Sequence, residues 1–213
     1  LIDASFLTTH PSALNFKIHN SFFMPNPIDE AFEILNNSKS NPRKDLFFAM
    51  SHGVHRGILK KGKIDEREFF LKKLQNKITD CKFDIFGMNN SQPIWGDDFL
   101  ANIKNYKMGL NLSRGKPIKY YSSDRLAQIM GNGLLTFIDK NTLLNRIIDK
   151  DCAVFYKNID DLANKIIYFK NNPIKLKKIA SKGKKFYTKN FNSKLVCSYI
   201  INKTFKINNK TNF

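Results

Sequence analysis

Short apolar runs alternate with segments of helical spacing over most of this chain, and this alternation constrains the fold more than any other feature. The runs predict strands at 46–50, 83–86, 108–112, 134–138 and 154–156. The segments between them predict helices at 65–78, 97–103, 122–131 and 142–148. Strands and helices that alternate at this spacing form parallel, doubly wound sheets. The sequence therefore predicts an α/β, Rossmann-like domain in which the carboxyl-terminal loops of the strands share one edge, where ligands bind.

Further helical patterns flank the alternating region. From 160 to about 205 the apolar residues follow helical spacing in three segments, broken near Pro173 and Asn190. Before the sheet, Pro25-Asn26-Pro27 stops any regular element, and residues 28–35 then favour a short helix. Residues 37–44 are polar and are typical of a linker. We therefore expect one sheet with C-terminal helices, preceded by a less regular segment.

The charge balance is strongly basic, with 36 Lys and Arg against 18 Asp and Glu and a formal net charge of +18. Only six of the basic residues are Arg, and the lysines are widely spread, whereas readers of nucleic acid favour arginine. No recognised nucleic-acid motif accompanies the charge, so we expect no nucleic-acid partner. The densest basic cluster, 175–189, favours peripheral contact with an anionic membrane surface instead.

The three cysteines stand at positions 81, 152 and 197 and share no metal-ligand spacing. This pattern predicts neither a disulfide framework nor a metal site. No apolar run approaches the ~20 residues that span a bilayer. We therefore expect a protein of the reducing cytoplasm, at the inner face of the membrane if the basic cluster binds lipid.

The stretch from Lys119 to Asp139 reads as loop, helix, turn and strand. Its helix has Ser122, Ser123 and Asp124 at the start and glycine at the end, which is the expected start and stop chemistry. The start of such a helix offers free backbone N–H groups and a positive dipole end, with Arg125 in the first turn. This helix end suits a phosphate.

The pattern Arg-Leu-x-x-x-Met-x-x-Gly, from Arg125 to Gly133, resembles the donor-binding helix of GT-B glycosyltransferases. The resemblance is to the CgeB-like (spore-coat-protein-like) group among the relatives of glycosyltransferase family 1 in particular, and it covers about 45–205. It implies the C-terminal half of a GT-B fold, with a remnant of the N-terminal domain and the interdomain linker at 1–44. A donor-binding domain at 45–190 and a C-terminal crossover helix and tail at 191–213 would follow.

The same resemblance implies transfer of a sugar from a nucleotide-sugar donor to an unknown acceptor, with no metal and no further cofactor. In GT-B enzymes the N-terminal half usually carries the acceptor site and the catalytic base, so no catalytic residue is assigned here. Arg56 with Lys61 and Gly62 resembles the diphosphate-binding pair of the retaining enzymes, although charged residues of a solvated loop would give the same pattern.

The loop after the third predicted strand brings hydroxyl groups and cations to the same sheet edge. Ser113 and Arg114 open this loop, and Arg114 is expected to pair with phosphate. Tyr121 is expected to stack on base or sugar, while Ser122 and Ser123 are expected to donate to the distal phosphate. For each of these residues alone, a local capping or solvent role fits equally well.

Two residues carry open alternatives. The resemblance places Gln128 where the family usually has a glutamate that accepts from the ribose hydroxyls, and an amide lacks the charge of a carboxylate. Gln128 either keeps a weaker ribose contact or is a plain polar helix position. Trp95, the only tryptophan, either lines the base pocket or packs in the core, which is favoured. A non-catalytic nucleotide or polyanion-binding module, peripheral to a membrane, is the alternative to an enzyme.

Overall fold

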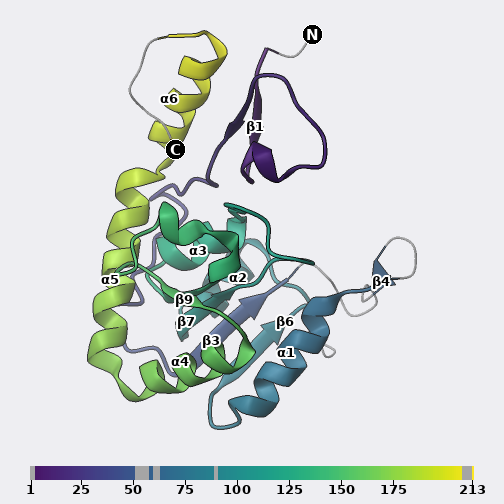
Figure 1. Ribbon diagram of the computed structural model, residues 1–213. Coiled ribbons are helices and arrows are strands. Elements are labelled where there is room, and N and C mark those ends of the chain that lie inside the picture. Colours follow the sequence, from purple (N-terminus) through teal and green to yellow (C-terminus); the bar gives the residue numbers. More distant parts are fainter. Residues whose placement is uncertain (1–2, 51–57, 60–62, 89–90, 208–212) are drawn as a thin grey trace.

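The computed structural model describes residues 3–50, 58–59, 63–88, 91–207 and 213 (Figure 1). Its centre is a five-stranded, fully parallel sheet in the order β6-β3-β7-β8-β9. The strands are β3 (Lys44–Ala49), β6 (Phe83–Phe86), β7 (Tyr106–Asn111), β8 (Leu135–Asp139) and β9 (Val154–Tyr156). The predicted α/β class with a parallel sheet is therefore confirmed, and each predicted strand lies within two residues of an observed one.

Helices cover both faces of the sheet because successive side chains of a strand point to opposite faces. Leu46 and Phe48 pack with α1 (Glu66–Lys77) and α4 (Ile159–Asn171), whereas Phe47 packs with α2 (Gly96–Ile103) and with Ile129 of α3 (Asp124–Gly131). The predicted C-terminal helices are α4, α5 (Pro173–Asn190) and α6 (Ser193–Thr204). Figure 1 shows α5 running along one side of the domain up to α6.

Smaller elements stand outside this sheet. The parallel pair β1 (Ser5–Leu7) and β2 (Ser21–Phe23) lies beside α6, and the short helix η1 (Pro11–Ala13) lies between its strands in sequence (Figure 1). An antiparallel pair, β4 (Ile58–Leu59) and β5 (Lys63–Ile64), precedes α1.

Two predicted helices are wrong. Residues 140–146 form two 3-10 turns, η2 (Lys140–Thr142) and η3 (Leu144–Arg146), because Leu143 between them has a left-handed backbone with φ of 57° that no α-helix continues through. Residues 28–35 form a single turn, in which the N–H groups of Phe32 and Glu33 bond to the Asp29 carbonyl. The chain then leaves the helical path to pack against α3.

The apolar face of α1 also differs from the predicted spacing. Phe69, one of the apolar residues on which that spacing was based, is 74% exposed, while Leu71 and Leu74 are fully buried. Asp65 caps the helix as expected, since its side chain accepts from the Arg67 N–H. Helical spacing found the helix, but a run of two phenylalanines and a leucine left its inward face ambiguous.

The segment 26–37 is held between α3 and α5. Ile28 donates to the Phe191 carbonyl at 3.0 Å and accepts from the Ser193 N–H at 2.8 Å, so this segment adds a parallel bridge beside the start of α6. The Tyr187 hydroxyl of α5 donates to the Asn26 carbonyl at 2.9 Å. These bonds bring the early part of the chain to the carboxyl edge of the sheet.

Asn37, in the segment 37–44 that is predicted to be a polar linker, is buried. It is 5% exposed, and its amide donates to the carbonyls of Ile103 at 2.9 Å and Tyr106 at 2.8 Å. We expect Asn37→Ala to lower the free energy of unfolding by about 2 kcal/mol, because two carbonyls would lose their donor. Urea unfolding measures this change. Asn41→Ala, at an exposed asparagine of the same segment, is the control and should change stability by less than about 0.5 kcal/mol.

Candidate functional site

The candidate site lies where the parallel strands end. The chain passes from β3 to β6 on one side and then to β7 on the other, so the direction of strand order reverses between β3 and β7. Ligands of open α/β sheets bind in the crevice at the carboxyl edge at such a point. The ends of β3 and β7 and the start of α3 therefore define the region in which a ligand is expected.

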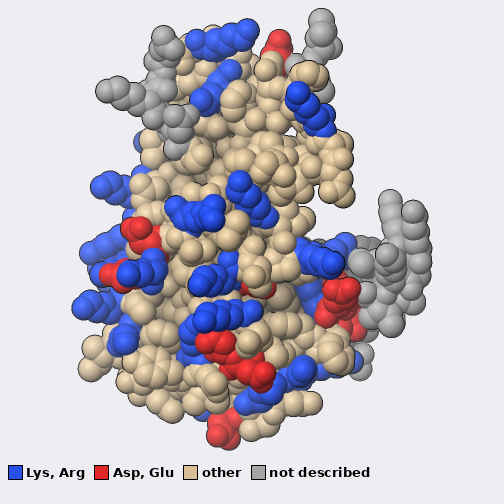
Figure 2. Space-filling model, in the orientation of Figure 1, with Lys and Arg blue, Asp and Glu red and all other residues tan. Residues whose placement is uncertain are grey.

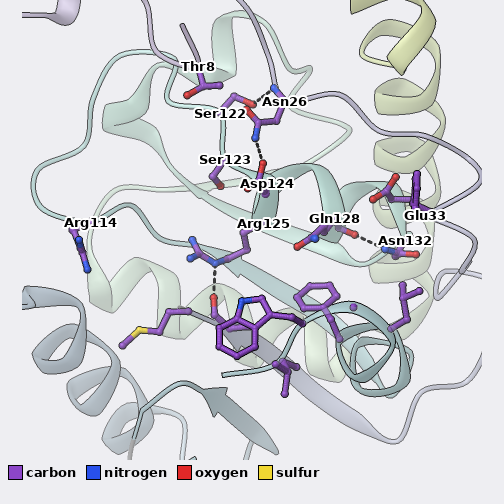
Figure 3. Close-up of a pocket in the computed structure, with 18 of the residues that line it drawn as sticks. Thr8, Asn26, Glu33, Arg114, Ser122, Ser123, Asp124, Arg125, Gln128 and Asn132 are labelled. Atoms are coloured by element: carbon purple, nitrogen blue, oxygen red, sulfur yellow. Dashed lines mark hydrogen bonds between the residues drawn. The ribbon is translucent and has the colours of Figure 1, made fainter. Parts of the chain in front are cut away.

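A cavity of about 750 Å³ opens in this region. That volume lies within the ~300–1,000 Å³ range of small-molecule sites. Six of the ten residues predicted to bind the donor line the cavity together: Arg114, Tyr121, Ser122, Ser123, Arg125 and Gln128. Figure 3 shows Arg114 and Glu33 on opposite sides of this cavity, with Arg125 and Gln128 between them.

Arg125 joins the two strand ends at the point of reversal. Its Nε donates to the carbonyl of Ala49, the last residue of β3, at 2.8 Å (Figure 3). Its Nη1 donates to the Leu112 carbonyl after β7 at 3.0 Å. The guanidinium stacks on the Phe48 ring at 4.6 Å. Burial, together with the positive charge of Arg67, lowers the pKa of Arg125 to about 10, so the group is still charged at neutral pH.

No carboxylate of the described residues forms a salt bridge with Arg125. Asp124 and Asp65 act on it only from a distance, and a partly buried cation that no carboxylate contacts is costly unless an anion completes the site. Its Nη2 group has no hydrogen-bond partner among the described residues. Arg125 therefore offers an anion-binding group in the middle of the cavity.

Two more arginines, Arg67 and Arg114, line the same cavity as Arg125. Arg67, which is 8% exposed, donates hydrogen bonds to the fully buried Asp65 carboxylate from its Nη2 at 2.6 Å and its Nε at 3.0 Å. Arg114, whose side chain is 55% exposed, forms a longer ion pair of 3.5 Å with the same carboxylate. The three guanidinium groups outnumber the two carboxylates beside them, Asp65 and Asp124, so this region of the cavity is net positive, which favours an anionic ligand.

The start of α3 differs in detail from the prediction. Ser123 is the N-cap: its hydroxyl accepts from the Leu126 N–H at 3.2 Å and donates to Asn111 at 2.9 Å. Asp124 is the first helical residue and not part of the cap. The N–H groups of Asp124 and Arg125 have no partner within the described ranges, so they are available to donate hydrogen bonds to a phosphate at the start of the helix.

Ser122 is tied into the protein. It is 2% exposed, and its hydroxyl accepts from the Asn26 N–H at 2.9 Å. The Asn26 amide in turn donates to the Asp124 carboxylate (Figure 3). The geometry therefore gives Ser122 a role in docking the early segment, and its predicted contact with the distal phosphate stays a prediction.

Glu33, Gln128 and Asn132 lie toward the other end of the cavity (Figure 3). Gln128 and Asn132 lie one helical turn apart, and Asn132 donates through its backbone and its amide to the Gln128 carbonyl. Trp95 lines the cavity and is 65% exposed, so the favoured expectation of a core tryptophan is wrong. The proline-bounded stretch before α2 leaves Trp95 outside the apolar face that Phe99 and Ile103 bury.

The remaining four predicted residues fall into two groups. Arg56, Lys61 and Gly62 lie outside the described residues. Ser113 lines a separate, neighbouring cavity of about 680 Å³ between α1 and the start of α4. The structure therefore separates Ser113 from the arginine group, although Arg67 borders both cavities.

The cavity residues that the sequence analysis missed include Asn26, Glu33 and Arg67. Arg67 had a signal, because a basic residue in the first turn of a helix opposes the dipole and needs a local partner such as Asp65. Asn26 and Glu33 had none, since they reach the cavity only through contacts with α3 and α5 that are distant in sequence.

The basic residues do not gather into one stripe on the face shown in Figure 2, where Lys and Arg are scattered with small groups of Asp and Glu between them. On α5, Lys177 bonds to Asn41, Lys182 pairs with Asp151 and Lys184 is half-buried. Part of the expected membrane-binding cluster is therefore engaged within the protein. Within the described ranges, no helix is both long enough and apolar enough to cross a membrane.

Comparison with known proteins places the fold in a family. Residues 66–201 match the model of the family described as "Glycosyl transferase-like". No curated protein matches the chain. Among solved structures, TarM of S. aureus is similar with a TM-score of 0.64 at 14% identity, over 95% of this chain and 43% of that one.

Two further structures show the same likeness. HepE of Anabaena has a TM-score of 0.58 at 11% identity, over 88% of this chain and 58% of that one. Sucrose-phosphate synthase of Thermosynechococcus elongatus has a TM-score of 0.56 at 10% identity, over 90% of this chain and 54% of that one. The chain thus spans about half the length of these proteins, and identities this low establish a shared fold.

The family match covers well over half of the chain, and the parallel sheet and its flanking helices agree with it. The predicted GT-B type of fold is confirmed by these structures. The chain belongs to the glycosyl transferase-like family, and its fold is that of a GT-B, Rossmann-like domain.

Proposed function

We propose that this chain is the donor-binding domain of a glycosyltransferase that moves a sugar from a nucleotide sugar to an acceptor without a metal. The observation that carries the proposal is Arg125, a cation without a carboxylate partner among the described residues, fixed at the reversal point of the sheet. A nucleotide diphosphate supplies the missing anion. The CgeB-like subgroup remains part of the proposal on the strength of the Arg125–Gly133 pattern.

The arginine-lined part of the cavity suits a diphosphate leaving group. When the bond between sugar and diphosphate breaks, negative charge grows on the phosphate oxygens, and fixed cations and N–H donors stabilise it. Arg125 and Arg114 provide guanidinium groups, and the start of α3 provides two N–H groups. Guanidinium groups pair with phosphate oxygens in two-point fashion, so they can take over the charge stabilisation that a metal ion gives elsewhere.

The proposal also includes the cell compartment, the acceptor and a contact with the membrane. Three free cysteines fit a reducing cytoplasm. An acceptor of glycan, lipid or protein type would approach from outside the cavity, and the lysines of α5 that are not engaged internally would supply any contact with an anionic membrane.

Titration calorimetry with nucleoside diphosphates tests the proposed function. The HepE structure and one TarM structure are complexes with UDP by title, so UDP is the first probe. We expect one nucleoside diphosphate to bind and, at 100 times its dissociation constant, to stabilise the protein by about 2.7 kcal/mol. Arg114→Ala should weaken that binding at least tenfold with little loss of stability, because the side chain is largely exposed.

Arg146→Ala, at an exposed arginine of η3 away from the cavity, is the matched control and should leave binding unchanged. Binding that depends steeply on salt and ignores the nucleoside would instead support a polyanion-binding module. Absence of binding to every nucleotide would refute the proposal.

A further inference from the structure

Glu33 is a carboxylate at the end of the cavity opposite the arginines. It is half-buried, and its Oε2 accepts from the Asp29 N–H at 2.8 Å. Its own backbone N–H lies close enough to act on the carboxylate as well, and no side chain of the described residues donates to it. A carboxylate whose only donors are nearby backbone N–H groups still has lone pairs facing the cavity, and these can accept from a ligand hydroxyl.

Lys184 of α5 holds the backbone beside this carboxylate. Its Nζ donates to the carbonyls of Glu33 at 3.1 Å, Leu35 at 2.7 Å and Gly131 at 2.5 Å. An ammonium group has three protons, so this side chain is fully used within the protein. Since Gly131 is the last residue of α3, the positive charge also lies at the favourable end of the helix dipole.

The C-terminal end of α3 allows Glu33 to pack closely against it. A Cβ atom at Gly131 would lie 2.6 Å from the Glu33 Cγ, so only glycine lets the two segments approach this closely. Asn132 accepts from the Leu35 N–H at 3.1 Å and adds a second attachment of the same segment. These contacts fix the position of Glu33 relative to Gln128, one turn earlier on the same helix.

We propose that Glu33 accepts hydrogen bonds from hydroxyl groups of the bound molecule, and that Lys184 is the positioning residue that holds it at the cavity wall. This inference rests on the proposed function, because a nucleotide sugar is a ligand with an anionic centre and hydroxyl groups on either side. The hydroxyl groups belong to the ribose or to the transferred sugar, and the experiment separates the two sources.

Calorimetry of the wild type and Glu33→Gln with four probes tests the first part: pyrophosphate, UDP, 2′,3′-dideoxy-UDP and UDP-glucose. The amide keeps the bond from Asp29 but loses the charge, so we expect about a tenfold loss of affinity for hydroxyl-bearing probes and none for pyrophosphate. If the ribose is the source, UDP loses affinity and dideoxy-UDP does not. If the sugar is the source, UDP-glucose alone loses affinity.

Acidic pH should reproduce the effect in the wild type. Burial raises the pKa of Glu33, with Asp29 adding to the shift and Lys184 opposing it. As pH drops, affinity for the same probe should therefore fall more steeply in the wild type than in Glu33→Gln, beginning above the ordinary range of a glutamate, because the probe's own phosphate titrates equally with both proteins. Asp29, Glu30 and Lys184 surround the group and are present in both proteins, so the difference isolates Glu33.

A double-mutant cycle tests the second part. Lys184→Met should lower affinity for the affected probe in the wild type but add nothing in the Glu33→Gln background, while it lowers thermal stability in both. Lys182→Met, at the exposed lysine two positions earlier on α5, is the control and should change neither affinity. Additive losses of affinity would remove Lys184 from this role.

The outcomes separate this inference from the proposed function. If the wild type binds UDP or UDP-glucose and Glu33→Gln binds every probe equally well, Glu33 is not the acceptor and the proposed function stands. If the wild type binds no nucleotide, both fail together.

Discussion

Replacing Gly87 with alanine is expected to lower the free energy of unfolding by about 3 kcal/mol or more, as measured by urea unfolding. Gly87 ends β6 with φ of +87°, a conformation that costs a residue with a Cβ roughly 1–2 kcal/mol. The added Cβ would also collide with the carbonyl of Met50, lying 3.1 Å from its carbon and still closer to its oxygen. Backbone cannot rotate away as a side chain can, so overpacking adds roughly 1–3 kcal/mol.

Gly115→Ala separates the two contributions. Gly115 has φ of +68°, but a Cβ there would meet no atom within 4 Å. Its alanine variant should therefore lose only the backbone term, about 1 kcal/mol. Equal losses at the two positions would show that the collision at Met50 is relieved by a small shift of the strands.

Replacing Arg125 with methionine is expected to abolish nucleotide binding and to lower the free energy of unfolding by about 2–3 kcal/mol. The carbonyls of Ala49 and Leu112 would lose charge-assisted bonds worth about 1.5–3 kcal/mol each, and part of that loss is returned because a buried charge is removed. Urea unfolding measures the first effect and calorimetry with UDP the second.

Arg125→Lys is the informative companion variant. Lysine keeps the charge but has no planar fork to reach two carbonyls at once. We expect it to regain part of the stability and little of the binding. A methionine variant that unfolds at the wild-type urea concentration would show that the two strand ends do not depend on this side chain.

Much of this fold could be predicted because the sheet is buried on both faces, so its strands read as apolar runs. Val154–Tyr156 and Phe83–Phe86 were predicted to the residue. The start of α3 was predictable because serine caps act on neighbouring residues. Leu143 shows the opposite case: its left-handed backbone has no local signature, and the apolar pattern around it fits a helix equally well.

The candidate site was predictable only in its local parts. Arg114 and Arg125 both lie in the connection that follows β7, and the end of that strand must stand at the ligand-binding edge of the sheet, so their place at this edge followed from the topology. Glu33 needed knowledge of where the early segment docks. The helical pattern of residues 28–35 was misleading. Only the turn at Asp29 forms, because contacts with α3 and α5 outweigh the local preference for a helix.

The docking of 26–37 against α5 has a consequence for biosynthesis. Asn26 and Glu33 leave the ribosome before their partners Tyr187 and Lys184, which are separated from them by about 150 residues of chain. Contacts of such high sequence separation form late because their loop-closure entropy must be met first. A nascent chain stalled before residue 173 should therefore have its parallel strands in place but one wall of the cavity still open.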